Sequence, residues 1–220
     1  WPYRGYDASG ADAHSGSFAQ GKARSRIMNS VDLIPGLAVS RETEAKLRAL
    51  EQMLAKWNPA INLVAKSTVA SAWSRHILDS AQLFMNHPFS TWADLGSGGG
   101  FPGLVIAAIA AEKQPAATII LVEVDQRKAA FLREAARQLG LSVTVKVERI
   151  EALEPLDADV LSARALAPFK DLCAFADRAT KRRTGHCPWR TPTPAGDFAA
   201  AKIAHLFGAK KDLRGWLASR

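Results

Sequence analysis

The chain has 220 residues, of which 48% are apolar and 23% are charged, and its 29 lysines and arginines outnumber 21 acidic residues to give a formal charge of +8. These proportions are typical of one globular domain that buries a core, and two cysteines are too few for a disulfide framework, so we expect a reducing, cytoplasmic setting. The longest apolar run, residues 103–111, is too short to span a bilayer, and we expect no secretory signal, which excludes the membrane and secreted classes.

The positive charge is concentrated at the two ends of the chain. Residues 1–27 carry four basic and two acidic residues, and residues 178–220 carry ten basic and two acidic ones. Residues 28–177 then carry 15 basic and 17 acidic residues, a net charge of −2. A basic excess indicates a polyanionic partner such as RNA only when it lies on the folded, functional part of a chain, so the charge alone assigns no RNA partner.

The composition also predicts how the chain is organised. Residues 1–27 mix Gly, Ser and Ala without periodicity and stop just before Met28, so we expect a disordered or non-native leader. An N-terminal helical part is predicted over residues 28–90, followed over residues 91–178 by a core in which helices and strands alternate. An atypical basic segment, residues 179–220, completes the chain.

Two helices are predicted in the N-terminal part. Ser40 is a suitable N-cap for an amphipathic helix with two acidic residues in its first turn, and Pro59 is expected to end that helix. A second helical pattern extends over residues 67–86. Trp57 and Trp73 occupy apolar positions of these patterns, so we assign both to the core rather than to base stacking.

From Trp92 onward, apolar strands alternate with helices. The expected strands are TWADL (91–95), ATIILVEV (117–124), VTVKV (143–147) and ADVLSARAL (158–166), and the expected helices are GLVIAAIAA (103–111) and Arg127–Leu139, which Gly140 stops. This alternation predicts the α/β class, with a mostly parallel sheet and helices on both faces. Three prolines interrupt the sequence after Arg178, and a short basic helix is expected from Asp197 to Trp216.

A glycine-rich loop, DLGSGGGFPG (94–103), connects the first predicted strand to its helix, where nucleotide-type ligands bind in such folds. Gly96 and Gly98 allow positive φ and close approach of the backbone to a ligand, and Phe101 adds an apolar wall. Phe101 stands where the dinucleotide fingerprint needs its third glycine, and no Gly-Lys-Ser/Thr of a P-loop follows. Asp94 is placed either to hold the loop or to bind a ligand ammonium group. The alternative is a tight turn that binds nothing.

Acidic and imidazole side chains surround this loop in the predicted fold. Glu123 ends the second strand, 27 residues after Gly96, where a carboxylate can accept hydrogen bonds from ribose hydroxyls, which favours an adenosyl ligand over an exposed strand-end acid. His76 and Asp79 share one helix face. We expect a structural or substrate-side role, with His76 hydrogen-bonded near the loop and Asn62 on the same side. No metal site is predicted, because no further ligands have suitable spacing.

Six segments of the sequence resemble the ribosomal small-subunit methyltransferase G family, also called glucose-inhibited division protein B. They are INLVA (61–65), RHILDS (75–80), ADLGSGGGFPG (93–103), LVEVDQRKAAFL (121–132), VERIEAL (147–153) and SARALA (162–167), within a match of about residues 40–177. RHILDS followed by DLGSGGGFPG is specific to that family as a pair. The resemblance implies a Rossmann-like class I methyltransferase fold, the cofactor S-adenosyl-L-methionine, and methylation of guanine N7 in 16S ribosomal RNA.

The resemblance also implies roles for individual residues. It implies cofactor contacts at Gly96, Phe101, Glu123, Ile150, Glu151 and Arg164, to which the loop adds Asp94 and Gly98. His76, Asp79 and Arg164 are the substrate-side candidates. The alternatives are an exposed loop acid for Glu151 and a surface ion pair for Arg164. No catalytic base is expected, because guanine N7 exposes a neutral lone pair and catalysis then depends mainly on proximity and orientation.

The C-terminal segment departs from the family pattern. The family's sheet continues beyond the fourth strand, and residues 179–220 contain no recognisable strand, so we expect the C-terminal strands to be missing or altered through a frame-shifted or replaced end. The expected partner is 16S ribosomal RNA or the small ribosomal subunit, and the expected state is a monomer. Two other functions remain open: a methyltransferase of a small molecule, suggested by the core charge of −2, and a non-enzymatic RNA-binding module that uses the basic tail.

Overall fold

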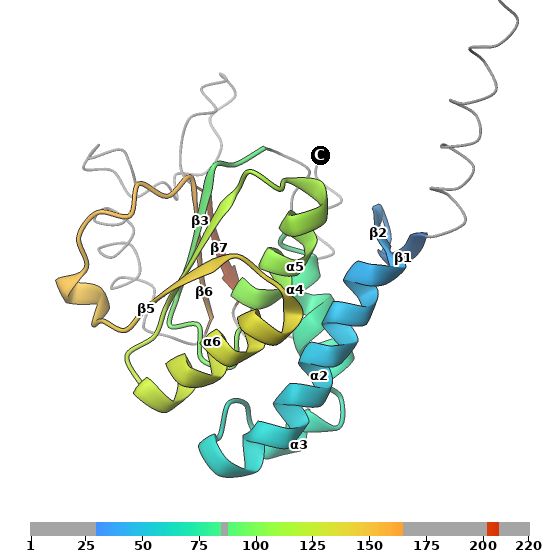
Figure 1. Ribbon diagram of the computed structural model, residues 1–220, viewed down its shortest axis with the longest axis horizontal. Coiled ribbons are helices and arrows are strands. Elements are labelled where there is room, and N and C mark those ends of the chain that lie inside the picture. The colour runs from blue at the N-terminus through green and yellow to red at the C-terminus, as the bar shows by residue number, and fades with distance from the viewer. Residues whose placement is uncertain (1–29, 85–87, 165–201, 207–220) are drawn as a thin grey trace, which may run out of the picture.

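The computed structural model of the chain describes residues 30–84, 88–164 and 202–206. The predicted leader and most of the predicted C-terminal segment lie outside these residues. The described chain forms a five-stranded sheet flanked by helices, preceded by a two-stranded hairpin (Figure 1). Within this described part, no helix combines the length and the apolar character that crossing a membrane requires.

The central sheet is entirely parallel and has the strand order β5-β4-β3-β6-β7. Its strands are β3 (Thr91–Leu95), β4 (Thr118–Val122), β5 (Val143–Lys146), β6 (Val160–Arg164) and β7 (Lys202–Leu206). The four predicted strands and their parallel pairing are confirmed. Because the chain adds β4 on one side of β3 and β6 on the other, the strand order reverses at β3, where ligands bind outside the carboxyl ends of such sheets.

Strand β7 corrects the expectation for the C-terminal segment. Residues 202–206 pair in parallel with β6, with Ile203 opposite Leu161, and do not continue a helix from Asp197 to Trp216. Without β7, the outer edge of β6 would present unpaired N–H and C=O groups, and this pairing overrides the local helical preference. The expectation that no further strand follows the fourth was therefore wrong.

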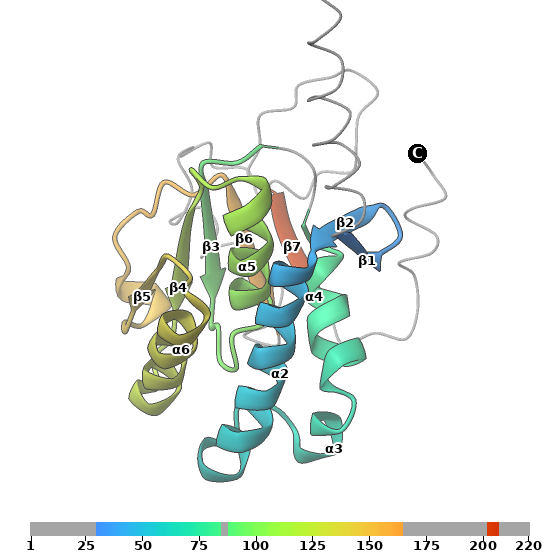
Figure 2. The same ribbon diagram turned by 45° about the vertical axis from the view of Figure 1, so that its right-hand side comes forward.

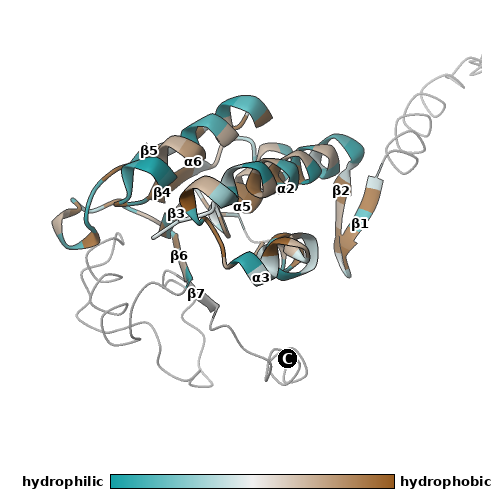
Figure 3. Ribbon diagram, turned by 90° about the horizontal axis from the view of Figure 1, so that it is seen from below, coloured by the Kyte–Doolittle hydropathy of each residue, from teal (hydrophilic) through white to brown (hydrophobic). Residues whose placement is uncertain are grey.

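The described α-helices lie on one face of the sheet (Figures 2 and 3). The long ones are α2 (Arg41–Ile61), α5 (Gly103–Lys113) and α6 (Gln126–Leu139). Their apolar side chains share one core with Trp92 and Leu121 of the sheet, so the N-terminal helical part and the α/β part are packed together. Ala93, Val122 and Leu161 point to the other face, where residues 150–158, including the 3-10 helix η2 (Ile150–Ala152), complete a smaller core. Helices were predicted on both faces, and the part of the chain that the structure describes places no α-helix on this second face.

Helix α2 begins where the sequence predicts and ends later. The Ser40 side chain accepts a hydrogen bond from Thr43 N–H at 3.1 Å, which is the expected N-cap. Pro59 lies inside the last turn, and the helix continues to Ile61. The next residue, Asn62, is the C-cap: its φ is 47° and its N–H donates to the Asn58 carbonyl at 3.0 Å. Asn62 therefore caps the helix in an exposed position.

One helix was predicted over residues 67–86, and in the part of this range that the structure describes, up to residue 84, the chain forms three short segments. These are α3 (Lys66–Val69), the π-helical turn η1 (Trp73–Leu78) and α4 (Asp79–Ala81). The hydroxyls of Thr68 and Ser71 donate to backbone carbonyls near the break, and such local bonds compete with a continuous helix. Trp57 and Trp73 are partly buried against the main core, as expected.

The hairpin at the start of the described chain was not predicted. Strand β1 (Ser30–Ile34) pairs antiparallel with β2 (Leu37–Ser40), with a turn at Pro35 and Gly36. Leu33, Leu37 and Val39 are buried and extend the main core over the start of α2. The hairpin thus packs against α2 and α5 on the helical side of the sheet.

Candidate active site

The glycine-rich loop lies at the carboxyl end of β3, where the strand order reverses. Gly96, Gly98 and Gly100 have φ values of 69°, 53° and 84°, which a side chain would strain. Ser97 N–H donates to the Val122 carbonyl at 3.0 Å and fastens the loop to the end of β4. The loop therefore holds a fixed shape with its backbone open to close approach.

Asp94 is fully buried beneath this loop. Its carboxylate accepts hydrogen bonds from Gly103 N–H at 3.2 Å and from the Ser162 hydroxyl at 2.7 Å, and Ser162 in turn accepts from the indole N–H of Trp92 at 2.8 Å. Burial raises the pKa of Asp94 to about 6, although hydrogen bonds from Ser162, Ser97 and Gly103 and the charge of Arg164 oppose the rise. Of the two roles predicted for Asp94, this geometry supports holding the loop.

Glu123 lies at the end of β4 with only 6% of its surface exposed. One carboxylate oxygen accepts from Gly98 N–H at 2.8 Å, and the other accepts from Asp125 N–H at 2.9 Å. The next residue, Val124, is 59% exposed and is the one large apolar side chain among the described residues that is exposed. A buried carboxylate beside an exposed apolar side chain matches what the ribose and the base of an adenosyl group need. Sequence reasoning did not identify Val124.

Ile150 and Glu151 belong to η2, which follows β5. Ile150 is partly buried and packs on the core that contains Val122 of β4. Glu151 is exposed, and Arg149 Nε lies 3.5 Å from its carboxylate. Because β5 is the neighbour of β4, these two residues and Glu123 lie on the same side of β3 in the strand order.

His76, Phe101 and Arg164 form a compact cluster on the other side of the glycine loop. Arg164, half-buried at the end of β6, lies with Nη1 3.0 Å from His76 Nδ1 and with its guanidinium 5.4 Å from the centre of the Phe101 ring. The His76 ring stacks on Phe101 at 5.2 Å between ring centres. The alternative of a surface ion pair for Arg164 is therefore not what the structure has.

Two carboxylates and a neutral imidazole surround Arg164. Burial lowers the pKa of Arg164, which Asp79 and Asp94 oppose, and burial raises the pKa of Asp79, which Arg164 and Arg75 oppose. Burial, followed by the charges of Arg164 and Arg75, lowers the pKa of His76 to about 4. His76 is therefore uncharged at neutral pH. In the part of the chain that the structure describes, no three His, Cys, Asp or Glu side chains gather to hold a metal ion.

The cluster also contains residues that the sequence did not identify. Thr68 Oγ1 lies 2.9 Å from His76 Nε2, and Ser162 bonds Asp94, as described above. Thr68 and His76 are separated by the break between α3 and η1, so no helical spacing connects them. Asn62, expected on this side, instead caps the end of α2.

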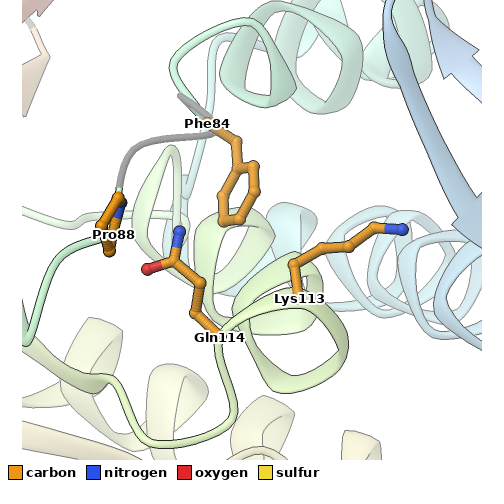
Figure 4. Close-up of a pocket in the computed structure, with 4 residues that line it drawn as sticks. All are labelled: Phe84, Pro88, Lys113 and Gln114. Carbon is orange, nitrogen blue, oxygen red and sulfur yellow. The ribbon is translucent and has the colours of Figure 1, made fainter.

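A separate hollow lies at the far end of α5. It has a volume of about 320 Å³ and is lined by Phe84, Pro88, Lys113 and Gln114 (Figure 4). The 11 residues of α5 place it roughly 15 Å from the glycine loop, at the amino ends of the strands. It lacks the perturbed carboxylates and the glycine loop of the candidate site.

Comparison with known proteins identifies the family. Residues 43–205 match the family of rRNA small subunit methyltransferase G, GidB. The chain belongs to this family. The match extends past the segment that the sequence motifs define, about residues 40–177, and includes most of β7.

Individual relatives agree with this assignment. Ribosomal RNA small subunit methyltransferase G of Cereibacter sphaeroides (strain ATCC 17025) is 59% identical over 142 residues, 64% of this chain and 68% of the relative. The protein of the same name from Ruegeria pomeroyi is 55% identical over 146 residues, 66% of this chain and 72% of the relative.

Solved structures are more distant. A putative transferase from Pyrococcus horikoshii is 16% identical with a TM-score of 0.41, covering 54% of this chain and 42% of that protein. The SAM-dependent O-methyltransferase of Thermotoga maritima is 21% identical with a TM-score of 0.37, covering 47% of this chain and 40% of that protein. The fold assignment rests on the parallel sheet and its strand order, and the family assignment on the sequence match.

Proposed function

We propose that this chain transfers a methyl group from S-adenosyl-L-methionine to N7 of a guanine in 16S ribosomal RNA. The observation that carries the proposal is membership of the rRNA small subunit methyltransferase G family. The glycine loop and the buried Glu123, side by side at the carboxyl ends of β3 and β4, supply the geometry.

The residues on the β4 side of the loop fit the adenosyl part of this cofactor. Glu123 offers two carboxylate oxygens that now accept backbone N–H groups and would accept the ribose hydroxyls, and Val124 and Ile150 offer apolar surface to the base. We assign cofactor contacts to Gly96, Gly98, Phe101, Glu123, Ile150 and Glu151, and we assign to Asp94 the support of the loop. When bound, S-adenosylmethionine supplies a methyl group activated by a positively charged sulfur.

The β6 side of the loop fits the methyl acceptor. Arg164 ends β6, and Glu123 ends β4, so the two residues lie on opposite sides of β3. His76 and Asp79 come from the helical segments beside Arg164. We therefore assign the substrate-side role to Arg164, His76 and Asp79. A guanine bound there would have its N7 beside Phe101, at the boundary between the two sides.

Methyl transfer to guanine N7 requires the protein mainly to position the two reactants. With the cofactor bound, guanine N7 would donate its lone pair to the methyl carbon, and the electron pair of the breaking carbon–sulfur bond would stay on sulfur. No proton has to be removed first, so His76, neutral and already hydrogen-bonded, is not needed as a base. The purine becomes positively charged, and the half-buried Asp79 carboxylate is the nearby negative charge that would stabilise it.

The finer points of the partner belong to the same proposal. We propose that the substrate is the 16S RNA or the small subunit that contains it, in the cytoplasm, and that the enzyme acts as a monomer. We also propose that residues 28–90 and 91–178 act as the helical and the cofactor-binding parts, with residues 1–27 as leader and residues 179–220 as an atypical C-terminal segment. The single core shared by the helical and α/β parts supports their acting as one unit.

Methyl incorporation tests the function. The full chain and S-adenosylmethionine labelled in the methyl group are incubated with small subunits isolated from cells that lack the modification, with free 16S RNA, and with a set of small-molecule acceptors. We expect label in RNA and none in the small molecules. Label only in a small molecule would establish a small-molecule methyltransferase, and RNA binding with no transfer would establish a binding module; either result would overturn the proposal.

A further inference from the structure

The hydrogen bond between Arg164 and His76 fixes the protonation of the imidazole. A guanidinium has only donors, so Arg164 Nη1 at 3.0 Å must donate to His76 Nδ1, which must carry a lone pair. The single ring proton of neutral His76 is then on Nε2. Burial and the neighbouring charges of Arg164 and Arg75 lower the pKa of His76 and keep the ring neutral, while the Asp79 carboxylate lies beside Arg164.

The bond continues to the start of α3. His76 Nε2 lies 2.9 Å from Thr68 Oγ1, and with its proton on Nε2 the imidazole donates to this hydroxyl. The Thr68 hydroxyl donates its own proton to the Ala65 carbonyl at 2.7 Å. Each proton in the chain from Arg164 to Ala65 has one direction, so no member can turn without breaking a bond.

The hydrogen-bond relay is the chain that leads from Arg164 through His76 and Thr68 to the Ala65 carbonyl. The packing around His76 and the direction of Arg164 keep it in place. His76 is 8% exposed, and its ring stacks on Phe101 with an interplanar angle of 27°. The π-helical turn η1 brings His76 to this position, and π-helical turns occur frequently at functional sites. Arg164 follows Val160 and Ser162 at every second position of β6, so it projects on the same face of the sheet as the helices.

Resting on the proposed function, we propose that Thr68 and His76 are positioning residues that hold Arg164 so that its remaining N–H groups bind an oxygen of the target nucleotide. Guanidinium has five N–H groups, and His76 occupies one. The oxygen is guanine O6 or a phosphate oxygen. Arg164 leaves N7 free, because an arginine donating to both O6 and N7 would occupy the lone pair that must attack.

The tautomer is tested without any transfer reaction. In protein labelled with ¹⁵N at histidine, we expect the resonance of His76 to show a protonated Nε2 and an unprotonated Nδ1 at pH 7. The assignment comes from the His76→Gln variant, whose spectrum lacks this signal. A protonated Nδ1, or a charged imidazolium at pH 7, would overturn the relay whatever the enzyme methylates.

A pair of variants at Thr68 tests the positioning. Thr68→Val keeps the shape but removes the acceptor of His76, and Thr68→Ser keeps the hydroxyl. We expect Thr68→Val to raise the KM for RNA about three- to tenfold, the effect of losing one neutral hydrogen bond, with S-adenosylhomocysteine affinity unchanged and with Thr68→Ser close to the parent. An unchanged KM in Thr68→Val, an equal loss in Thr68→Ser, or an equal loss of cofactor affinity would each overturn the proposal.

Two further readouts separate the possible failures. If the parent enzyme transfers no methyl group to RNA, the proposed function fails, while the ¹⁵N spectrum still decides the relay. The salt dependence of RNA binding distinguishes the acceptors of Arg164. A phosphate contact predicts a smaller salt slope in Thr68→Val, by up to about one, whereas a contact to O6 predicts an unchanged slope with weaker binding.

Discussion

Arg164 is the charged group at the centre of the side of the site that we propose binds the methyl acceptor. It donates to neutral His76, lies near the face of Phe101 and has Asp79 and Asp94 as its neighbouring carboxylates. Its guanidinium is half-buried yet retains donors that no described residue is shown to use. A fork of donors held at the end of a strand is well suited to a nucleotide oxygen.

Replacing Arg164 by lysine tests this organisation. An ammonium group keeps the charge, but its donors all sit on one nitrogen and form no planar fork, so it cannot reach His76 and an RNA oxygen in the geometry that the guanidinium provides. We expect kcat/KM for RNA to fall by at least about tenfold, equivalent to ~1.4 kcal/mol, with calorimetric binding of S-adenosylhomocysteine unchanged. Arg75→Lys is the matched control, because the Arg75 side chain is exposed and the substitution keeps its charge. Equal losses in the two variants would contradict the assignment.

The raised pKa of Asp94 and the lowered pKa of His76 predict opposite effects of pH on the free energy of unfolding. The pKa of Asp94 is raised to about 6, so the native state holds an extra proton from pH 4 to 6 and Asp94 reduces stability as pH rises through this window. The pKa of His76 is lowered to about 4, so the unfolded state holds the extra proton between pH 4 and 6.5 and His76 increases stability as pH rises. The two contributions oppose each other over the same range.

A single variant separates these contributions. In Asp94→Asn, the group that titrates near pH 6 is gone, so the free energy of unfolding should rise with pH between 4 and 6 more steeply than in the parent, by on the order of 1 kcal/mol per pH unit at most. Urea unfolding at four pH values measures this difference. An identical pH dependence in the parent and the variant would show that Asp94 does not titrate there.

Helices and strands are predicted best from the sequence where the apolar pattern and the capping residues of one segment are enough to define it. β3 and β4 are continuous apolar runs, and α6 has both an amphipathic pattern and Gly140 as a left-handed cap, so their bounds are nearly as expected. The hairpin at residues 30–40 was missed because its strands are short. The helix predicted over residues 67–86 is broken because Thr68 and Ser71 bond backbone carbonyls, a competition that apolar spacing does not reveal.

The same limit applies to the site. Asp94, Glu123 and the glycines could be placed from the sequence because they stand at the ends of predicted strands. Thr68, Ser162 and Val124 could not, because their contribution depends on which segments meet in space. His76 was placed near the loop, but its bond to Arg164 joins residues 88 apart, which no periodic pattern connects.

The start of α2 is fastened to the end of α5 by Glu112. Its carboxylate accepts Ser40 N–H at 2.8 Å and the Thr43 hydroxyl at 2.7 Å. Burial raises the pKa of Glu112, but hydrogen bonds from Lys113, Ser40 and Thr43 outweigh this and hold it at about 2. The stabilisation is therefore present above pH 4.5 and is lost as pH falls toward 2.

Glu112→Gln should destabilise the chain by less than about 1 kcal/mol at pH 7, since the carboxylate is partly exposed and screened by solvent. The difference from the parent should shrink as pH falls from 4.5 to 2, which thermal unfolding at low ionic strength measures. Glu42→Gln removes an exposed partner of Lys46 and is the control with a smaller effect. A constant difference across this pH range would exclude the ionised carboxylate as the cause.

For the whole molecule, β7 decides whether the sheet is complete on the acceptor side. It covers the edge of β6, the strand that carries Arg164, so the far end of the chain supports the site. The pairing was not predicted from the sequence, because the strand formed by residues 202–206 is short and its partner strand lies about 40 positions earlier. The family match to residue 205 agrees with a native role for this strand.

Two neighbouring proline variants test the pairing of β7. Successive residues of an edge strand point their N–H groups alternately toward the sheet and away from it, so one of Ile203→Pro and Ala204→Pro should remove a ladder bond and the other should not. We expect faster hydrogen exchange in residues 160–164 for one variant only. Similar exchange rates in both variants would show that β7 does not pair with β6 in solution.

The proposed transfer to guanine N7 of 16S RNA is tested most directly by locating the methyl group in the product. The full chain is incubated with unmodified small subunits, the 16S RNA is extracted, and the RNA is cleaved chemically at N7-methylguanine. We predict one new cleavage site in the parent reaction and a greatly weakened one with Glu123→Ala, which lacks the carboxylate assigned to the ribose. A methyl group on any other atom, or on no RNA at all, would contradict the account.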